Sequence, residues 1–230
     1  MRTLGLIAIG GLGIGIASLS LAYALGGRDL HRLPFELASS CGGAKGGPSV
    51  RHLAWDSGEA IELSLPGTVY FRGGQGSDIV VKGSPDLVAN VEVRGRRLVL
   101  DCHGWMAGRD LEITLPGRAL RDIRIAGSGK LVMENVSQPD LDLRISGSGS
   151  MRAQGSVDQV TIKVSGSGEA RLGDLAMKQL KVEISGSGKV EAAPKDSADV
   201  RISGSGDVKL LSRPVNLTSK VSGSGRISQP

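Results

Sequence analysis

Apolar and polar residues alternate with period two in many short runs of the chain beyond residue 50. Alternation of this kind predicts β-strands that bury one face and expose the other. The clearest early runs are 60–65 and 111–115, and each is followed by a turn, at Pro66 and Pro116. After residue 30, the segment whose hydrophobic pattern comes closest to that of a helix is 174–181, which is short and lies inside a repeat. The pattern therefore predicts an all-β domain.

A Gly-Ser-Gly triplet recurs through the second half of the chain. The copies begin at residues 127, 147, 166, 186, 204 and 223, so the intervals are 18 to 20 residues. Apolar residues precede each triplet at alternate positions, as at 141, 143 and 145, and follow it at alternate positions, as at 151 and 153. Each repeat is therefore expected to contain a strand, a tight corner, a second strand and a looser turn.

A single repeat of this length cannot bury its apolar side alone. Stacked repeats can pair their backbones with the repeats above and below, and their inward side chains then form a continuous apolar column. The predicted fold is a parallel β-helix, or β-solenoid, over residues 51–230, with its clearest repeats in 120–227. Glycine is expected at the corners because the chain bends there with positive φ. The serine between the two glycines is expected to be structural, because it is small and its hydroxyl can hydrogen-bond to the neighbouring coil.

The repeated Ile-Ser-Gly-Ser-Gly units, at 145–149 and 202–206, resemble the bacterial GIN-domain family, which is described as the head domain of auto-transporter adhesins. The strand before a proline turn at 111–116 also matches the general pattern of that family. The resemblance extends over about residues 50–227. It implies a bacterial, exported, β-helical domain with no enzymatic activity and no established catalytic or binding residues.

An uncharged, mostly apolar segment runs from Leu4 to Leu25. Its 22 residues are enough to cross a bilayer as a helix. The segment also has the features of a signal peptide, with 22–24 as a small-residue cleavage site. We therefore expect export to the periplasm or cell envelope, with residues 1–27 as a cleaved signal or an uncleaved membrane anchor. Residues 28–50 are expected to be a Gly-rich linker.

The chain contains two cysteines, Cys41 in the expected linker and Cys102 in the expected domain. In an exported protein a lone pair of cysteines can form a disulfide. The sequence leaves open whether these two residues meet.

The sequence contains no recognisable catalytic or metal-binding motif. The three histidines, His31, His52 and His103, form no metal-spaced group with the cysteines, and no nucleophile elbow occurs. Gly129-Lys130 is followed by Leu131, where a phosphate-binding loop requires Ser or Thr. We therefore expect a protein that is not an enzyme and uses no cofactor or metal. One alternative is a carbohydrate-active β-helix enzyme. Such an enzyme needs acidic groups that converge in a cleft, and the best candidates in the sequence are Asp140 and Asp142.

Outward basic residues form the candidate binding surface. Nucleic acid is not an expected partner, because aromatic residues make up only 3% of a chain with a net charge of +5. Three residues before the first glycine of each triplet stand Arg124, Arg144, Lys163, Glu183, Arg201 and Lys220. In a solenoid these residues form one column in which all but Glu183 are basic. Such a column favours binding to an anionic glycan or to lipid headgroups, and the alternative is a solvated face.

A second column is expected to consist of Glu169, Lys189, Asp207 and Arg226, with charges that alternate in sign. Opposite charges on facing strands stabilise a sheet, so this column has a structural interpretation.

These observations together favour a non-enzymatic, exported cell-envelope protein with a structural or adhesive role. Its expected partners are an anionic glycan, lipid headgroups or an envelope protein, together with the membrane if the N-terminal segment is retained. A membrane-tethered sensor or interaction module is a further alternative, because an uncleaved anchor would hold the domain at the membrane.

Overall fold

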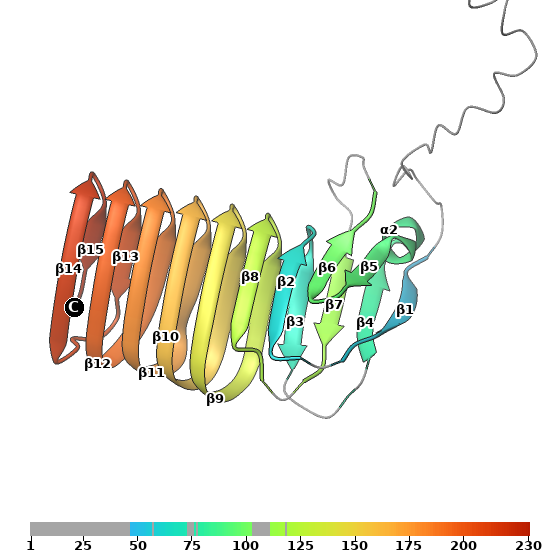
Figure 1. Cartoon of the computed structure of the whole chain (residues 1–230), viewed down its shortest axis with the longest axis horizontal. Coiled ribbons are helices and arrows are strands. Elements are labelled where there is room, and N and C mark those ends of the chain that lie inside the picture. Colours follow the sequence, from blue (N-terminus) through green and yellow to red (C-terminus); the bar gives the residue numbers. More distant parts are fainter. Residues whose placement is uncertain (1–46, 57, 73–75, 77, 103–110, 118) are drawn as a thin grey trace, which may run out of the picture. The chain divides into compact units, whose positions relative to one another are not determined.

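The computed structural model describes residues 47–230, apart from 57, 73–75, 77, 103–110 and 118. These residues belong to one compact unit, Ser39–Pro230. Its strands join in one sheet that coils into a stack of parallel rungs (Figure 1). The predicted all-β solenoid is confirmed. The expected signal or anchor at 1–27, and the expected linker as far as residue 46, lie outside the described residues.

Four long strands form the regular part of the stack. They are β9 (Lys130–Gly147), β10 (Ser150–Gly166), β11 (Glu169–Gly186) and β12 (Lys189–Gly204). The last coils consist of β13 (Asp207–Leu210), β14 (Asn216–Gly223) and β15 (Arg226–Ser228). All of these strands pair in parallel, and the residues before the triplets stand in register from Ser146 to Ser222.

We call the ladder of strand segments that precede the corners the front wall. It contains β8 (Asp122–Gly127), the second halves of β9 to β12, and β14, and it is extended beyond β8 by β2 (Ala60–Ser64) and β6 (Arg97–Leu100). The segments that follow the corners form the rear wall. Irregular register occurs in the turn that leads from the rear wall back to the front wall, for example between Arg152 and Gly155 and between Leu172 and Ala176. This turn therefore absorbs the unequal repeat lengths, while the corners stay aligned.

The two glycines of each triplet are needed for different reasons. The first has positive φ, from 97° at Gly127 to 125° at Gly204, which confirms the prediction. The second has no such φ, but a Cβ on Gly206 would lie 2.7 Å from Cγ2 of Ile184 in the preceding coil. The backbone N–H of the middle serine donates to a glycine carbonyl one coil away, at 2.9 Å for Ser205 and Gly186. Within the described residues the hydroxyl of Ser205 forms no hydrogen bond, so the contact between coils is made by its backbone alone.

The core lies between the two walls and consists of aliphatic residues at the predicted alternate positions. Leu143, Ile162 and Val200 are completely buried, as are Met133 and Leu172 from the rear wall. No charged or polar residue is buried in the described part of the chain. In the last coil, the inward residues Leu217 and Val221 remain 38% and 42% exposed, because no described element packs beyond them.

The order of the first coils in space differs from their order in the chain. β2 (Ala60–Ser64) lies between β6 (Arg97–Leu100) and β8, and β3 (Thr68–Arg72) lies between β7 (Leu111–Leu115) and β9. The corner of this inserted coil is at Gly67, with φ of 110°. The coil from β2 to β3 is therefore stacked between two coils that follow it in the sequence.

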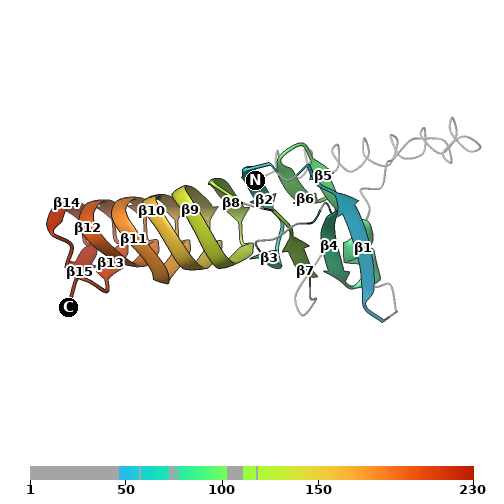
Figure 2. The ribbon, with the colours of Figure 1, turned by 90° about the horizontal axis from the view of Figure 1, so that it is seen from below.

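Antiparallel strands close the N-terminal end of the solenoid (Figure 2). β1 (Ser49–Ala54) pairs with β4 (Asp78–Gly83), β4 pairs with β7, and β5 (Val91–Arg94) pairs with β6. The short helix α2 (Pro85–Ala89) buries Leu87 and Val88 in the core. The hydrophobic pattern did not predict this helix, while the segment 174–181 is part of β11. None of the helices among the described residues is long and apolar enough to cross a membrane.

Candidate binding face on the front wall

The outward side chains of the front wall form columns that run along the stack. One column, which we call the charged column, consists in order of Arg97, Glu62, Arg124, Arg144, Lys163, Glu183, Arg201 and Lys220. All five basic residues selected from the sequence therefore stand in one line with Glu183. Sequence reasoning missed Arg97 and Glu62, because β6 and β2 lie outside the repeats and stack out of chain order.

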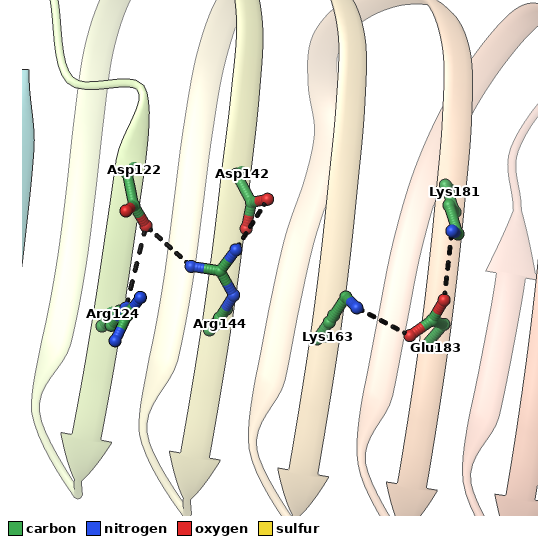
Figure 3. A network of polar contacts seen from close by, with 7 residues as sticks. All are labelled: Asp122, Arg124, Asp142, Arg144, Lys163, Lys181 and Glu183. Carbon is green, nitrogen blue, oxygen red and sulfur yellow. Dashed lines mark hydrogen bonds and ion pairs between the residues drawn. The ribbon is translucent and has the colours of Figure 1, made fainter.

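A second column runs beside the charged column, two residues earlier on each strand. Its members are Asp122, Asp142, Thr161, Lys181, Asp199 and Thr218. Arg144 reaches into it and places Nη1 3.0 Å from Oδ1 of Asp122 and Nη2 3.0 Å from Oδ2 of Asp142 (Figure 3). Arg124 also lies 3.9 Å from Asp122. Two arginines and two aspartates thus neutralise each other over β8 and β9.

The balance of charge is different over β10 to β14. Lys163 and Lys181 share the carboxylate of Glu183, at 3.1 Å and 3.2 Å, and Arg201 pairs with Asp199 at 2.8 Å. Lys220 has no carboxylate partner among the described residues. The two columns here contain four cations (Lys163, Lys181, Arg201, Lys220) and two carboxylates (Glu183, Asp199), a surplus of two positive charges. The hydrogen bonds from Lys163 and Lys181 lower the pKa of Glu183, so this carboxylate stays ionised below its usual range.

A groove lies over this positively charged part of the wall. Its volume is about 410 Å³. The charged column from Lys163 to Lys220 lines it, and so does a column of short side chains that we call the serine column: Ser165, Ser185, Ser203 and Ser222. Between the two columns the groove meets the strands at Val164, Ile184 and Ile202, whose side chains are buried in the core. We call this feature the serine groove.

The serine column presents exposed hydroxyl groups. Its members stand in register on successive coils, at the strand spacing of ~4.8 Å. All four are exposed, and within the described residues their hydroxyls form no hydrogen bond. These hydroxyls can therefore donate to, and accept from, a ligand in the groove.

Other hollows of the described surface have less regular linings. One of about 280 Å³ lies beside Arg94, Arg96 and Arg97 at the N-terminal end of the front wall. Arg94 is already bonded to Glu92 and Asp101, which raise its pKa, and Arg97 is paired with Glu62 at 2.9 Å. A hollow of about 470 Å³ on the rear wall is lined by uncharged residues together with Lys82 and Glu112.

The remaining candidates from the sequence are not brought together into a site. Asp140 pairs with Arg121 at 3.2 Å, while Asp142 pairs with Arg144. No group of three or more His, Cys, Asp or Glu residues that could hold a metal occurs in the described part of the chain. Cys102 packs partly buried against the core. Cys41 lies outside the described residues, so the disulfide stays a prediction.

The alternating column of the rear wall has the predicted register. Glu169 faces Lys189, Lys189 faces Asp207, and Asp207 faces Arg226. The ion pair of Glu169, however, is formed with Arg171 on its own strand, at 2.8 Å.

Comparison with known proteins identifies the family. The family model described as "Putative auto-transporter adhesin, head GIN domain" matches residues 59–214. The chain belongs to this GIN-domain family. The match begins one residue before β2 and ends in the turn before β14, so it includes most of the front wall of the GIN domain.

A solved structure shares this fold, and a second one is similar over most of the chain. A "putative adhesin" from Bacteroides fragilis NCTC 9343 is 18% identical, with a TM-score of 0.64, over 80% of this chain and 97% of that chain. A "putative lipid binding protein" from Parabacteroides distasonis ATCC 8503 is 17% identical, with a TM-score of 0.48, over 81% of this chain and 98% of that chain. A search of curated proteins gives no match. At 18% identity, the likeness to the Bacteroides protein shows the fold of the GIN domain and nothing about its ligand.

Proposed function

We propose that this GIN domain is a non-enzymatic, exported adhesion module of the cell envelope, and that its front wall attaches to an anionic surface. The observation that carries the proposal is the charged column, which stands in register along the stack and lies over β10 to β14 in a region with a surplus of two positive charges. One exposed cation contributes little to binding, but a row of cations on a rigid wall acts on one surface at the same time.

The construction of the wall supports this role. β9 to β12 are each 16 to 18 residues long, and Gly-Ser-Gly corners join them without long loops. Parallel pairing on both sides holds the charged side chains at fixed spacing. A rigid array loses little conformational entropy when it binds, which favours affinity.

Export is the second part of the proposal. It is supported by the uncharged segment from Leu4 to Leu25 and by the adhesin description of the family. A fusion of the full chain to a reporter that is active only after export should give a signal. N-terminal sequencing of the exported protein then distinguishes cleavage near Ala24 from a retained anchor. An inactive reporter, with the fusion intact in the cell, would contradict export.

Binding is tested with the full chain purified from the host envelope. Anionic and neutral polysaccharides, and vesicles with and without anionic lipid, are each immobilised and offered at low and at physiological salt. We expect retention on at least one anionic surface and on no neutral one, with a loss as salt shortens the Debye length to ~8 Å. No retention on any anionic surface at low salt would overturn the proposed function.

A further inference from the structure

We propose that the serine groove binds a single polysaccharide chain that lies along the solenoid axis and carries one acidic group on every second sugar. This inference rests on the proposed function and specifies its ligand. The groove follows the stack across four coils, from β10 to β14, which is about 15 Å for three strand spacings. A lining that repeats at each coil is suited to a ligand that itself repeats.

The two sides of the groove offer two kinds of contact. The serine column presents one hydroxyl at each coil, and sugar hydroxyls are matching donors and acceptors. The charged column presents cations that can pair with a carboxylate or a sulfate. No aromatic side chain lines the groove, so stacking of nucleic-acid bases has no platform there.

The spacing of charge selects among acidic glycans. Lys163 and Arg201 are two coils apart, and Glu183 stands between them in the same column. Lys163 and Arg201 are therefore separated by about 10 Å, with a carboxylate at the intervening rung, and Lys220 stands one rung beyond Arg201. This separation is comparable with the length of an extended disaccharide. A glycan with an acid on every sugar would place one anion against Glu183, whereas an acid on alternate sugars avoids that contact.

The depth of the groove favours a glycan over a membrane surface. Serine is much shorter than the lysine and arginine side chains of the neighbouring column, so its hydroxyl lies at the floor of the groove. A single glycan chain can enter and bond to these hydroxyls. The headgroup layer of a vesicle is broad, and it would meet the ends of Lys163, Arg201 and Lys220 first. Dependence on the serines therefore distinguishes the two ligands.

The test compares S185A/S203A with the control S187A/S205A in the full chain. Ser185 and Ser203 line the groove, while Ser187 and Ser205 occupy the same two corners outside it. Hyaluronan, which has an acid on alternate sugars, is the main probe. Polygalacturonate has an acid on every sugar, dextran is neutral, and phosphatidylglycerol vesicles represent a membrane. Dissociation constants and melting temperatures are measured for each protein.

We expect S185A/S203A to bind hyaluronan about tenfold more weakly than the wild type, because two hydrogen bonds are lost. Its melting temperature and its vesicle binding should stay unchanged, and the control should bind hyaluronan normally. Hyaluronan binding that does not depend on the groove serines, or tighter binding to polygalacturonate, would overturn the glycan assignment while the proposed function stands. If the wild type binds vesicles but no glycan, the assignment is also wrong. Absence of binding to every anionic probe would contradict the proposed function itself.

Discussion

Lys163 and Glu183 face each other on adjacent coils, with Nζ of the lysine 3.1 Å from Oε2 of the glutamate. Lys181, on the strand of Glu183, contacts the other carboxylate oxygen at 3.2 Å. Glu183 is the one acidic residue that lines the groove, and its carboxylate forms ion pairs with both of these lysines. Its charge should limit how strongly the front wall attracts anions.

Glu183→Gln is expected to strengthen binding to an anionic polymer about two- to fivefold at low salt, since one negative charge is lost and two lysines are released. The control is Glu191→Gln on the rear wall, where Glu191 lies 3.5 Å from Lys209. Titration with dextran sulfate, followed by fluorescence or calorimetry, measures the difference. Equal effects of the two substitutions would show that only net charge matters.

The ionisation of Glu183 also predicts a pH dependence. Its pKa is lowered in the folded protein by hydrogen bonds from Lys163 and then Lys181. The stability that the ionised group contributes is thus present above its unfolded pKa and is lost as pH falls through its folded pKa. Binding of dextran sulfate, whose sulfates stay ionised, should strengthen over the same acidic range. The part of this increase that is due to Glu183 should be absent in Glu183→Gln.

Neutralising the groove cations should weaken binding with little loss of stability. We expect K163Q/R201Q/K220Q to lose about tenfold or more in affinity for anionic polymers at low salt. The matched control is K189Q/K209Q/R226Q, which removes three cations from the rear wall, on β12, β13 and β15. Neutral replacements are preferable to reversed charges, because a glutamate at 163 would face Glu183. Equal affinity losses in both variants would contradict a dedicated front-wall site.

Arg144 should matter more for stability than for binding. Its guanidinium bridges Asp122 of the preceding coil and Asp142 of its own strand, and Oδ1 of Asp142 is buried without a partner. Arg144→Gln leaves two carboxylates side by side, so we expect a loss of about 1 kcal/mol in the free energy of unfolding. Arg152→Gln is the control, because Arg152 has one exposed pair with Asp174 at 2.7 Å. Urea denaturation compares them, and equal midpoints would rule out the bridging role.

The corner glycines give a test of the fold. Gly204 has φ of 125°, and a Cβ there would lie 2.5 Å from the carbonyl oxygen of Gly186. Gly204→Val should therefore destabilise the domain by at least ~1–3 kcal/mol through backbone strain alone. Ser205→Ala should change little, because only the backbone N–H of Ser205 bonds to the coil below. Thermal melts of both variants check this, and a shared melting temperature would contradict the tight-corner geometry.

The cysteine pair can be tested directly. If Cys41 and Cys102 are linked in the exported protein, mass spectrometry of an unreduced digest should show one crosslinked peptide pair. The bond would tie the N-terminal region to the end of the solenoid that the antiparallel strands close. Free thiols at both positions in freshly exported protein would refute the pairing.

The sequence alone was enough to determine the repeating part of this protein. Alternation with period two assigns inward positions such as Leu143 and Ile162, and the spacing of the triplets aligns Arg144 with Lys163. Both inferences succeed because stacked parallel strands place equivalent residues on top of one another. Positive φ at the first glycine of each triplet follows from the same sharp bend.

Only the tertiary structure decided how the charges combine and where the groove lies. Asp122 and Arg144 are 22 residues apart, and they meet because arginine is long enough to reach diagonally between columns, which a repeat period does not specify. The insertion of β2 and β3 between later coils adds Arg97 and Glu62 to the charged column, and no periodicity encodes that order. The physical reason is that a repeat determines which residues share a column, whereas side-chain reach and the stacking of non-repeating strands depend on the assembled solenoid.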